Sequence, residues 1–322
     1  MSPSDTSTTY SLPTANSLAT TPDDNPSSND SNEAPTELPK PKLRLQIHDL
    51  RHSGSNVFTS LVPDLASTVD SALAAIIKHL YNPPGPPKHD ETCTATISKA
   101  PIPTFTPSVP PTRSITVFLR DIGGVAYTTG TELDDDHKEI HVSLQYILTA
   151  TKLQDPRAEI LGVLTHELVH CYQHTTPMQG GDAVLRPPAG LIEGIADFVR
   201  LKAGFVPSHW KRPSSAKERA EKWDQGYQHT AFFLEWLEDL RIGRGAVGKL
   251  NDQLLRVGYV GEDVKLEDET LELGHTSFWK GLFGSGVKEL WDEYGEFIDK
   301  HGKLNTERSS GNWEDEIVNP SE

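Results

Sequence analysis

The sequence has little of what marks a secreted disulfide-bonded protein or a membrane protein. Only two cysteines occur among its 322 residues, Cys93 and Cys171, so no disulfide framework is expected. No run of eighteen apolar residues is present, so no membrane span is expected. The first residues lack the basic start and the apolar stretch of a secretory signal, which favours a cytoplasmic location.

Positive charge is also scarce. The chain has 30 Lys and Arg residues against 46 Asp and Glu residues, which gives a formal net charge of −16. Such a field repels phosphate backbones and anionic lipid. We therefore expect neither nucleic acid nor a membrane surface as a partner, whereas a neutral or cationic substrate is compatible with this charge.

Composition divides the chain into three predicted parts. Residues 1–41 are rich in Ser, Thr and Pro and have too few large apolar groups to offset the entropy cost of ordering, which predicts a disordered arm. Residues 42–303 carry the apolar patterns of a folded domain, and residues 304–322 form a short polar tail. Within the domain, residues 82–113 hold nine prolines, which indicates an irregular connection.

Hydrophobic periodicity predicts strands first and helices afterwards. Alternating apolar residues indicate strands at 43–47, 115–119 and 140–144. The glycine-containing stretch 123–130 is predicted to form turns. Helical spacing indicates helices at 61–80, 190–203, 216–241, 246–256 and 276–300. This order favours an α+β fold with a small N-terminal sheet and a mainly helical C-terminal part.

One further helix has a well-defined start. Asp155 suits the N-cap, Pro156 suits the first helical position, and Glu159 favours the positive end of the helix. Four apolar residues are predicted to form its buried face: Ile160, Leu161, Leu164 and Leu168.

This helix carries the motif His166-Glu167-Leu-Val-His170. Residues four apart on a helix share a face, so the two imidazoles can hold one Zn²⁺ ion. The intervening Glu167 is then placed as the general base for a water whose pKa the zinc lowers. The alternative reading of the motif is a solvated helix surface.

A third histidine ligand is not available on the same helix. The metzincin pattern requires Gly and then His after the second histidine, and this chain has Gln173 and Thr176 at those positions. His174 continues the stripe of His166 and His170, yet three ligands at successive steps of four residues cannot converge on one tetrahedral ion. We interpret His174 as a polar residue near the helix C-terminus.

The next predicted helix supplies carboxylates instead. Glu193 and Asp197 share one face among apolar neighbours, where a carboxylate pair needs a cation or donors. Glu193 as the third zinc ligand and Asp197 as the partner of a zinc-binding histidine meet that need. The alternative is an exposed acidic edge. The combination resembles the glutamate-zincin pattern, in which a second helix adds ExxxD to HExxH.

The resemblance extends beyond the ligands. The segments HELVHCYQH and PPAGLIEGIADFVRLKAG resemble the basic secretory protein family of plants and bacteria, as do GGVAYTTG, KEIHVSLQYI and KWDQGYQHTAFFLEWLE. The resemblance implies a zincin-like fold with a small mixed sheet, one zinc ion per chain, and peptidase activity on a peptide or protein substrate. The resemblance also allows secretion. However, the family name describes basic, secreted proteins, whereas this chain is acidic and shows no signal pattern.

Three further sites are weaker candidates. Tyr227 lies in the family-like GYxxTAxFLxW stretch, where its phenol can stabilise an oxyanion or simply pack in an apolar stripe. His229 is a second candidate for the same role. The segment 139–143 is predicted to be an edge strand that binds an extended peptide through Ile140, His141 and Val142, with an inner strand as the alternative.

The sequence therefore predicts a zinc metallopeptidase that cleaves peptide bonds with zinc-activated water. Two alternatives stay open. One is a zinc hydrolase acting on a non-peptide amide or ester, and the other is a catalytically silent binding protein on a zincin scaffold.

Overall fold

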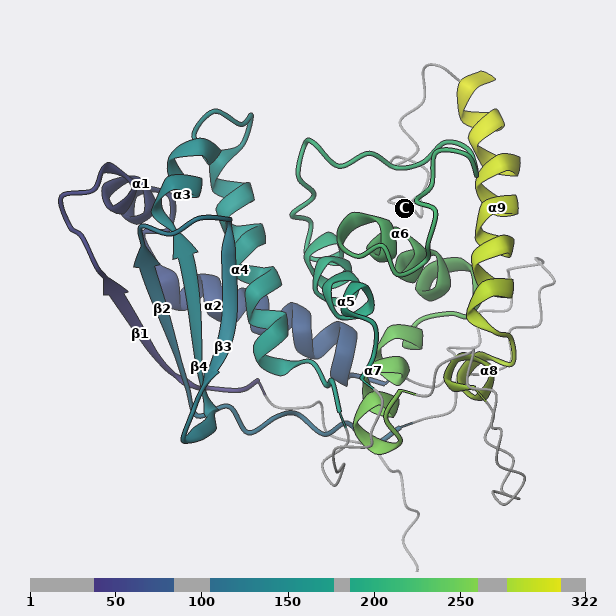
Figure 1. The fold of residues 1–322 in the computed structure, drawn as a ribbon, viewed down its shortest axis with the longest axis horizontal. Helices are drawn as coiled ribbons and strands as arrows, with labels where there is room; N and C mark the ends of the chain where they lie inside the picture. Colours follow the sequence, from purple (N-terminus) through teal and green to yellow (C-terminus); the bar gives the residue numbers. More distant parts are fainter. Residues whose placement is uncertain (1–37, 84–104, 177–185, 260–276, 308–322) are drawn as a thin grey trace, which may run out of the picture. The chain divides into compact units, whose positions relative to one another are not determined.

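A computed structural model describes residues 38–83, 105–176, 186–259 and 277–307 (Figure 1). Most of the predicted N-terminal arm, Cys93 and the tail beyond residue 307 lie outside the described residues. Within these ranges no single helix is long and apolar enough to cross a membrane. One bent pair, Ser53–Leu61 with Leu65–Tyr81, passes the same test of length and composition.

The sheet has four strands in the order β1-β2-β4-β3. They are β1 (Lys42–Ile47), β2 (Ser114–Arg120), β3 (Ala126–Thr131) and β4 (Asp134–Ser143). The first two pairings, β1 with β2 and β2 with β4, are parallel, and β3 runs antiparallel to β4. The predicted small mixed sheet is therefore confirmed, with β1 and β3 as its outer strands.

The other regular elements of the described residues are helices. They are α1 (Ser53–Leu61), α2 (Leu65–Ile76), α3 (Leu144–Ala150), α4 (Pro156–Tyr172), α5 (Ala189–Lys202), α6 (Tyr227–Trp236), α7 (Ala246–Arg256), α8 (Phe278–Phe283) and α9 (Val287–Glu307). Single π-helical turns, η1 (Ile77–Tyr81) and η2 (Leu237–Arg241), continue α2 and α6. The fold is α+β, as predicted. Helix α4 lies between the sheet and α5 and contacts both (Figure 1).

The stretch predicted to form turns, 123–130, instead contains most of strand β3. The side chains of β3 alternate in burial, with Tyr127 and Thr129 exposed and Ala126 and Thr128 half-buried. Because most of these residues are polar, a search for alternating apolar residues did not find the strand. The register shifts between Gly130 and Thr131, where the strand turns back into β4. A strand with a mainly polar sequence forms here because β4 supplies its backbone hydrogen bonds.

Several helix boundaries also differ from the predictions. The predicted helix 61–80 begins only at Leu65, because Pro63 lies just before the N-cap Asp64, whose side chain accepts a hydrogen bond from the Ser67 N–H. The predicted helix 276–300 is divided at Gly284, where φ is +78°. The predicted helix 216–241 does not form before Tyr227, because Gly226 has φ +88°.

Candidate active site

Helix α4 begins as the sequence predicts. The Asp155 carboxylate accepts a hydrogen bond from the Ala158 N–H at 2.9 Å, and Pro156 is the first helical residue. Ile160, Leu164 and Leu168 are buried. Packing against the sheet on one side and α5 on the other buries nearly all of the helix, and this fixes the direction of its polar side chains.

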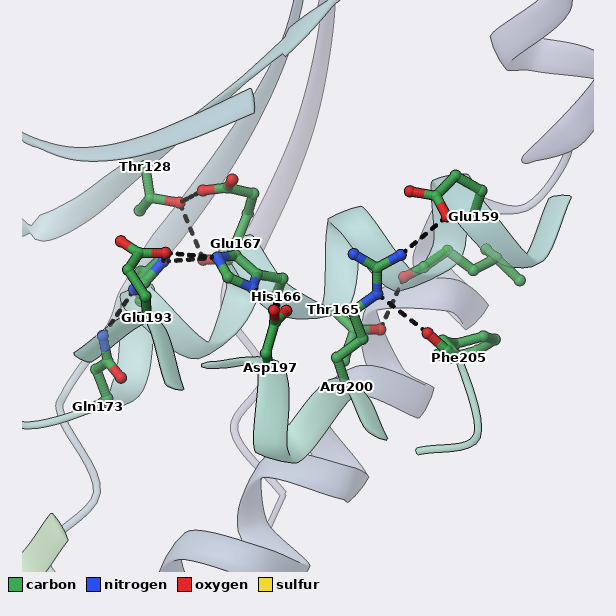
Figure 2. A network of polar contacts seen from close by, with 12 residues as sticks. Thr128, Glu159, Thr165, His166, Glu167, Gln173, Glu193, Asp197, Arg200 and Phe205 are labelled. Atoms are coloured by element: carbon green, nitrogen blue, oxygen red, sulfur yellow. Dashed lines mark hydrogen bonds and ion pairs between the residues drawn. The ribbon is translucent and has the colours of Figure 1, made fainter. Parts of the chain in front are cut away.

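Helices α4 and α5 bring together three atoms of the type that binds metal ions, one each from His166, His170 and Glu193, and we call this group the ligand cluster. Figure 2 labels His166 and Glu193. His166 Nε2 lies 3.1 Å from His170 Nε2 and 3.1 Å from Glu193 Oε2. His170 Nε2 lies 3.7 Å from the same carboxylate oxygen. Ligand atoms around a tetrahedral zinc at the usual bond lengths lie about 3.3 Å apart. The donor set and its spacing therefore fit one zinc ion with a further position left for water or substrate.

The other ring nitrogens orient the two imidazoles. His166 Nδ1 lies 2.7 Å from Asp197 Oδ1, so its N–H donates to that carboxylate and Nε2 is left as the acceptor. His170 Nδ1 lies 2.6 Å from the Gln173 amide nitrogen, while Gln173 Oε1 is buried without a partner in the described part of the chain. The reverse orientation of this amide lets Oε1 accept from His170 Nδ1, which satisfies both groups.

The charges around this cluster favour a cation. Burial by itself lowers the pKa of His166, but the carboxylates of Asp197 and Glu193 outweigh it and raise that pKa to about 9. Burial also raises the pKa of Glu193, yet its contacts with His166 and His170 lower it to about 2. In the protein without metal, a proton on His166 therefore balances the carboxylates. A divalent ion can take over that role.

Glu167 is buried beside the ligands, with 5% of its surface exposed. Its Oε2 atom lies 2.7 Å from the hydroxyl of Thr128 on β3, and its main-chain oxygen lies 2.9 Å from the same hydroxyl (Figure 2). Apolar periodicity did not identify Thr128 as a site residue, because Thr128 lies in the stretch that was predicted to form turns.

Tyr227 borders the ligand cluster from α6. Its ring lies nearly parallel to that of His166, with an interplanar angle of 15° and centroids 6.1 Å apart. Its φ of +45° is unusual for a residue other than glycine, and 57% of its surface is exposed. Tyr227 is therefore not a core residue, which was the alternative reading.

Two glycines on α5 allow this approach. A Cβ atom on Gly190 would lie 1.8 Å from the Asp224 main-chain oxygen, and one on Gly194 would lie 2.3 Å from Thr230 Cγ2. Larger residues at either position would push α6 and Tyr227 away from the cluster.

The model of the BSP family, described as peptidases of plants and bacteria, matches residues 40–294. The chain belongs to the BSP family. This finding confirms the predicted resemblance, and the family description supports a peptidase with peptide or protein substrates. No curated protein and no solved structure match the chain.

In this BSP-family chain the ligand cluster opens into a cavity of about 990 Å³. Its walls come from β3, α4, α5 and the start of α6, including Val125, Ala126, Thr128, Glu193 and Tyr227. His229 also lines the cavity. An outer strand thus borders the site, but it is not the strand that the sequence indicated.

The edge-strand prediction for 139–143 is wrong. Strand β4 pairs with β2 on one side and β3 on the other, so it is an inner strand. Ile140 and Val142 are fully buried in the core. The His141 ring is stacked between Phe118 and Tyr127, with centroids 4.8 and 4.5 Å apart, and burial lowers the pKa of His141.

His174 is engaged elsewhere, in line with its interpretation as a residue at the helix end. Its Nε2–H donates to the Ser108 main-chain oxygen at 2.9 Å, and its main-chain N–H donates to Asn251 Oδ1 at 2.9 Å. Buried Cys171 donates to the Glu167 main-chain oxygen at 3.6 Å and packs in the core.

A second polar group on the same helices was missed by the sequence analysis. Glu159, predicted only as a favourable charge at the helix start, pairs with Arg200 at 3.1 Å and accepts from the Tyr146 hydroxyl at 2.7 Å. Glu159 and Arg200 are 4% and 7% exposed, and both line the cavity. The seven-residue spacing from Glu159 to His166, which places both on one face of α4, was the available signal.

Proposed function

We propose that this BSP-family protein is a zinc-dependent metallopeptidase with a zincin-like domain over residues 42–303. One zinc ion per chain is held by His166, His170 and Glu193. The observation that supports this most is the mutual spacing of three ligand atoms, 3.1, 3.1 and 3.7 Å, contributed by two helices. Asp197 and Gln173 orient the two imidazoles.

When bound, zinc supplies a Lewis acid that lowers the pKa of water and polarises the substrate carbonyl. Glu167 is the general base of the reaction. It takes the proton of the attacking water, and it gives this proton to the nitrogen of the peptide bond as the C–N bond breaks. Its place one residue after His166, on the cavity wall, supports this role.

Tyr227 is the candidate donor to the tetrahedral oxyanion. The phenol of Tyr227 is protonated at neutral pH, because the ordinary pKa of tyrosine is about 10. The negative charge of Glu193, followed by partial burial, raises the pKa of Tyr227 further. A phenol on the cavity wall whose ring lies over His166 is placed to donate to a group bound at the cluster.

We further propose that an extended peptide binds along β3. This strand is at the end of the sheet order, and Val125, Ala126, Tyr127 and Thr128 line the cavity. Free backbone groups of an outer strand pair with an added strand, and the pairing gives affinity that depends little on sequence. Strand β3 thus replaces the segment 139–143 as the proposed substrate-binding strand.

The test combines metal analysis with activity. We expect about one zinc per purified chain and hydrolysis of unfolded casein that is lost after chelation and restored by zinc. Glu167→Gln should keep the zinc and lose hydrolysis, whereas Glu193→Gln should lose the zinc. Glu296→Gln, at an exposed position on α9, is the matched control and should change neither.

The outcomes separate the alternatives. Full activity of metal-free protein would overturn the proposal. Cleavage of small esters or amides without cleavage of casein would favour a non-peptide hydrolase. A zinc-loaded chain inert towards all of these substrates would favour a binding protein.

A further inference from the structure

Thr128 is the described residue that links the outer strand to the general base. Its hydroxyl lies 2.7 Å from Glu167 Oε2 and 2.9 Å from the Glu167 main-chain oxygen. A threonine hydroxyl has a single proton, so it donates to one of these oxygens at a time. The ionised carboxylate is the stronger acceptor of the two, because hydrogen bonds to a charged oxygen are stronger than those to a neutral one.

The contact makes the two oxygens of the Glu167 carboxylate unequal. Oε2 accepts from Thr128, while Oε1 has no hydrogen-bond partner in the part of the chain that the structure describes. A glutamate side chain otherwise has several rotatable bonds, and a fixed position reduces the entropy lost when the reacting groups align. The oxygen without a partner is then the one available to carry the proton.

The position of Thr128 along the strand adds a second consequence. Ala126 and Thr128 are half-buried, whereas Tyr127 and Thr129 are exposed, so the side chains of β3 alternate between the α4 side and the outer face. The hydroxyl of Thr128 therefore reaches α4 from the same strand whose residues Ala126, Tyr127 and Thr128 line the cavity. A peptide paired with β3 and the carboxylate of Glu167 are both held in place by this one strand.

We infer that Thr128 is a positioning residue, which fixes the Glu167 carboxylate relative to a peptide bound along β3. The inference rests on the proposed function. Thr128 contacts the proposed general base Glu167. Loss of the Thr128 hydroxyl should therefore slow the chemical step and have little effect on substrate binding.

The kinetic test uses zinc-loaded protein and a fluorogenic peptide derived from casein. Thr128→Val keeps the shape of the side chain and removes the hydroxyl, and we expect kcat to fall roughly 10- to 100-fold with KM within about twofold. Thr128→Ser restores a hydroxyl and should return kcat to within about threefold of the wild type. Thr59→Val, at an exposed position on α1 that does not line the cavity, is the matched control and should leave both constants unchanged.

A second measurement reports on the contact without activity. Thermal unfolding of the metal-free wild type, Thr128→Val, Glu167→Ala and the double variant forms a double-mutant cycle. Thr128→Val should lower the midpoint by about 2 °C in the wild type and by clearly less when Glu167 is already Ala, where the hydroxyl can donate only to the main-chain oxygen of residue 167. An equal loss in both backgrounds would show that Thr128 acts only through the main chain or through general packing, and would overturn the inference.

The two proposals fail in different ways. Wild-type kcat in Thr128→Val, or an equal fall in Thr128→Ser, overturns the role of Thr128 while the role of Glu167 stands. Full activity of Glu167→Gln overturns the proposed function and, with it, any catalytic role for Thr128, even if the unfolding cycle shows the contact.

Discussion

The ring of Tyr227 lies over the ring of His166, 6.1 Å away between centroids and within 15° of parallel. The two residues are 61 positions apart in the sequence and belong to different helices, α6 and α4. The positive φ of Tyr227 directs its side chain towards the ligand cluster at the point where α6 begins. A strained residue beside a cluster of metal-ligand type is characteristic of a functional site.

Removal of the Tyr227 hydroxyl tests its role as an oxyanion donor. Tyr227→Phe keeps the ring and the backbone, and we expect kcat/KM on peptide substrates to fall about 100-fold, the effect of losing one donor to an oxyanion. Zinc content should not change. Tyr294→Phe, at a tyrosine on α9 that does not line the cavity, should keep full activity and serves as the control.

Asp197 should affect zinc affinity more than the chemical step. It is 2% exposed and holds the Nδ1–H of His166 at 2.7 Å. Asp197→Asn weakens this acceptor, and we expect zinc affinity to fall about 10- to 100-fold, as measured by competition with a chromogenic chelator. Activity at saturating zinc should largely recover. Asp70→Asn, at an exposed position on α2, should leave zinc affinity unchanged.

The buried pair of Glu159 and Arg200 should contribute to stability in a coupled way. Arg200→Leu leaves the Glu159 carboxylate buried without its cation, which costs about 3–5 kcal/mol of unfolding free energy. Replacing both residues by Leu should cost clearly less than the sum of the two single changes, because no buried charge is left alone. Urea unfolding of the three variants measures this, and additive losses would contradict it.

His79 should make the fold sensitive to acid. Burial, followed by the positive charge of Lys78, lowers the pKa of His79 from 6.5 to about 4. Between these values the unfolded chain binds more protons than the folded chain, so the free energy of unfolding decreases as the pH falls from 6.5 towards 4. His79→Gln should make this decrease shallower in thermal melts across the range, while the same change at exposed His209 should not.

The N-terminal cap, the face shared by His166 and His170, and the second helix with Glu193 and Asp197 could all be predicted from the sequence. Each depends on spacing within a single helix, and backbone geometry fixes which residues share a face whatever surrounds the helix. The α+β class and three of the four strands, β1, β2 and β4, followed from apolar periodicity for the same local reason.

The tertiary structure alone decided which strand borders the site. Strand β4 lies between β2 and β3, and its residues are more apolar than those of β3 because it is buried. An apolar pattern therefore indicates that a strand is buried, and it does not identify an outer strand. Strand β3 has a polar sequence, and its order depends on hydrogen bonds to β4 and on the contact of Thr128 with Glu167. The meeting of Glu193 with the two histidines, and of Tyr227 with His166, likewise depends on how α4, α5 and α6 pack. Glycines at 190 and 194 permit that close packing, and no periodicity within one segment encodes it.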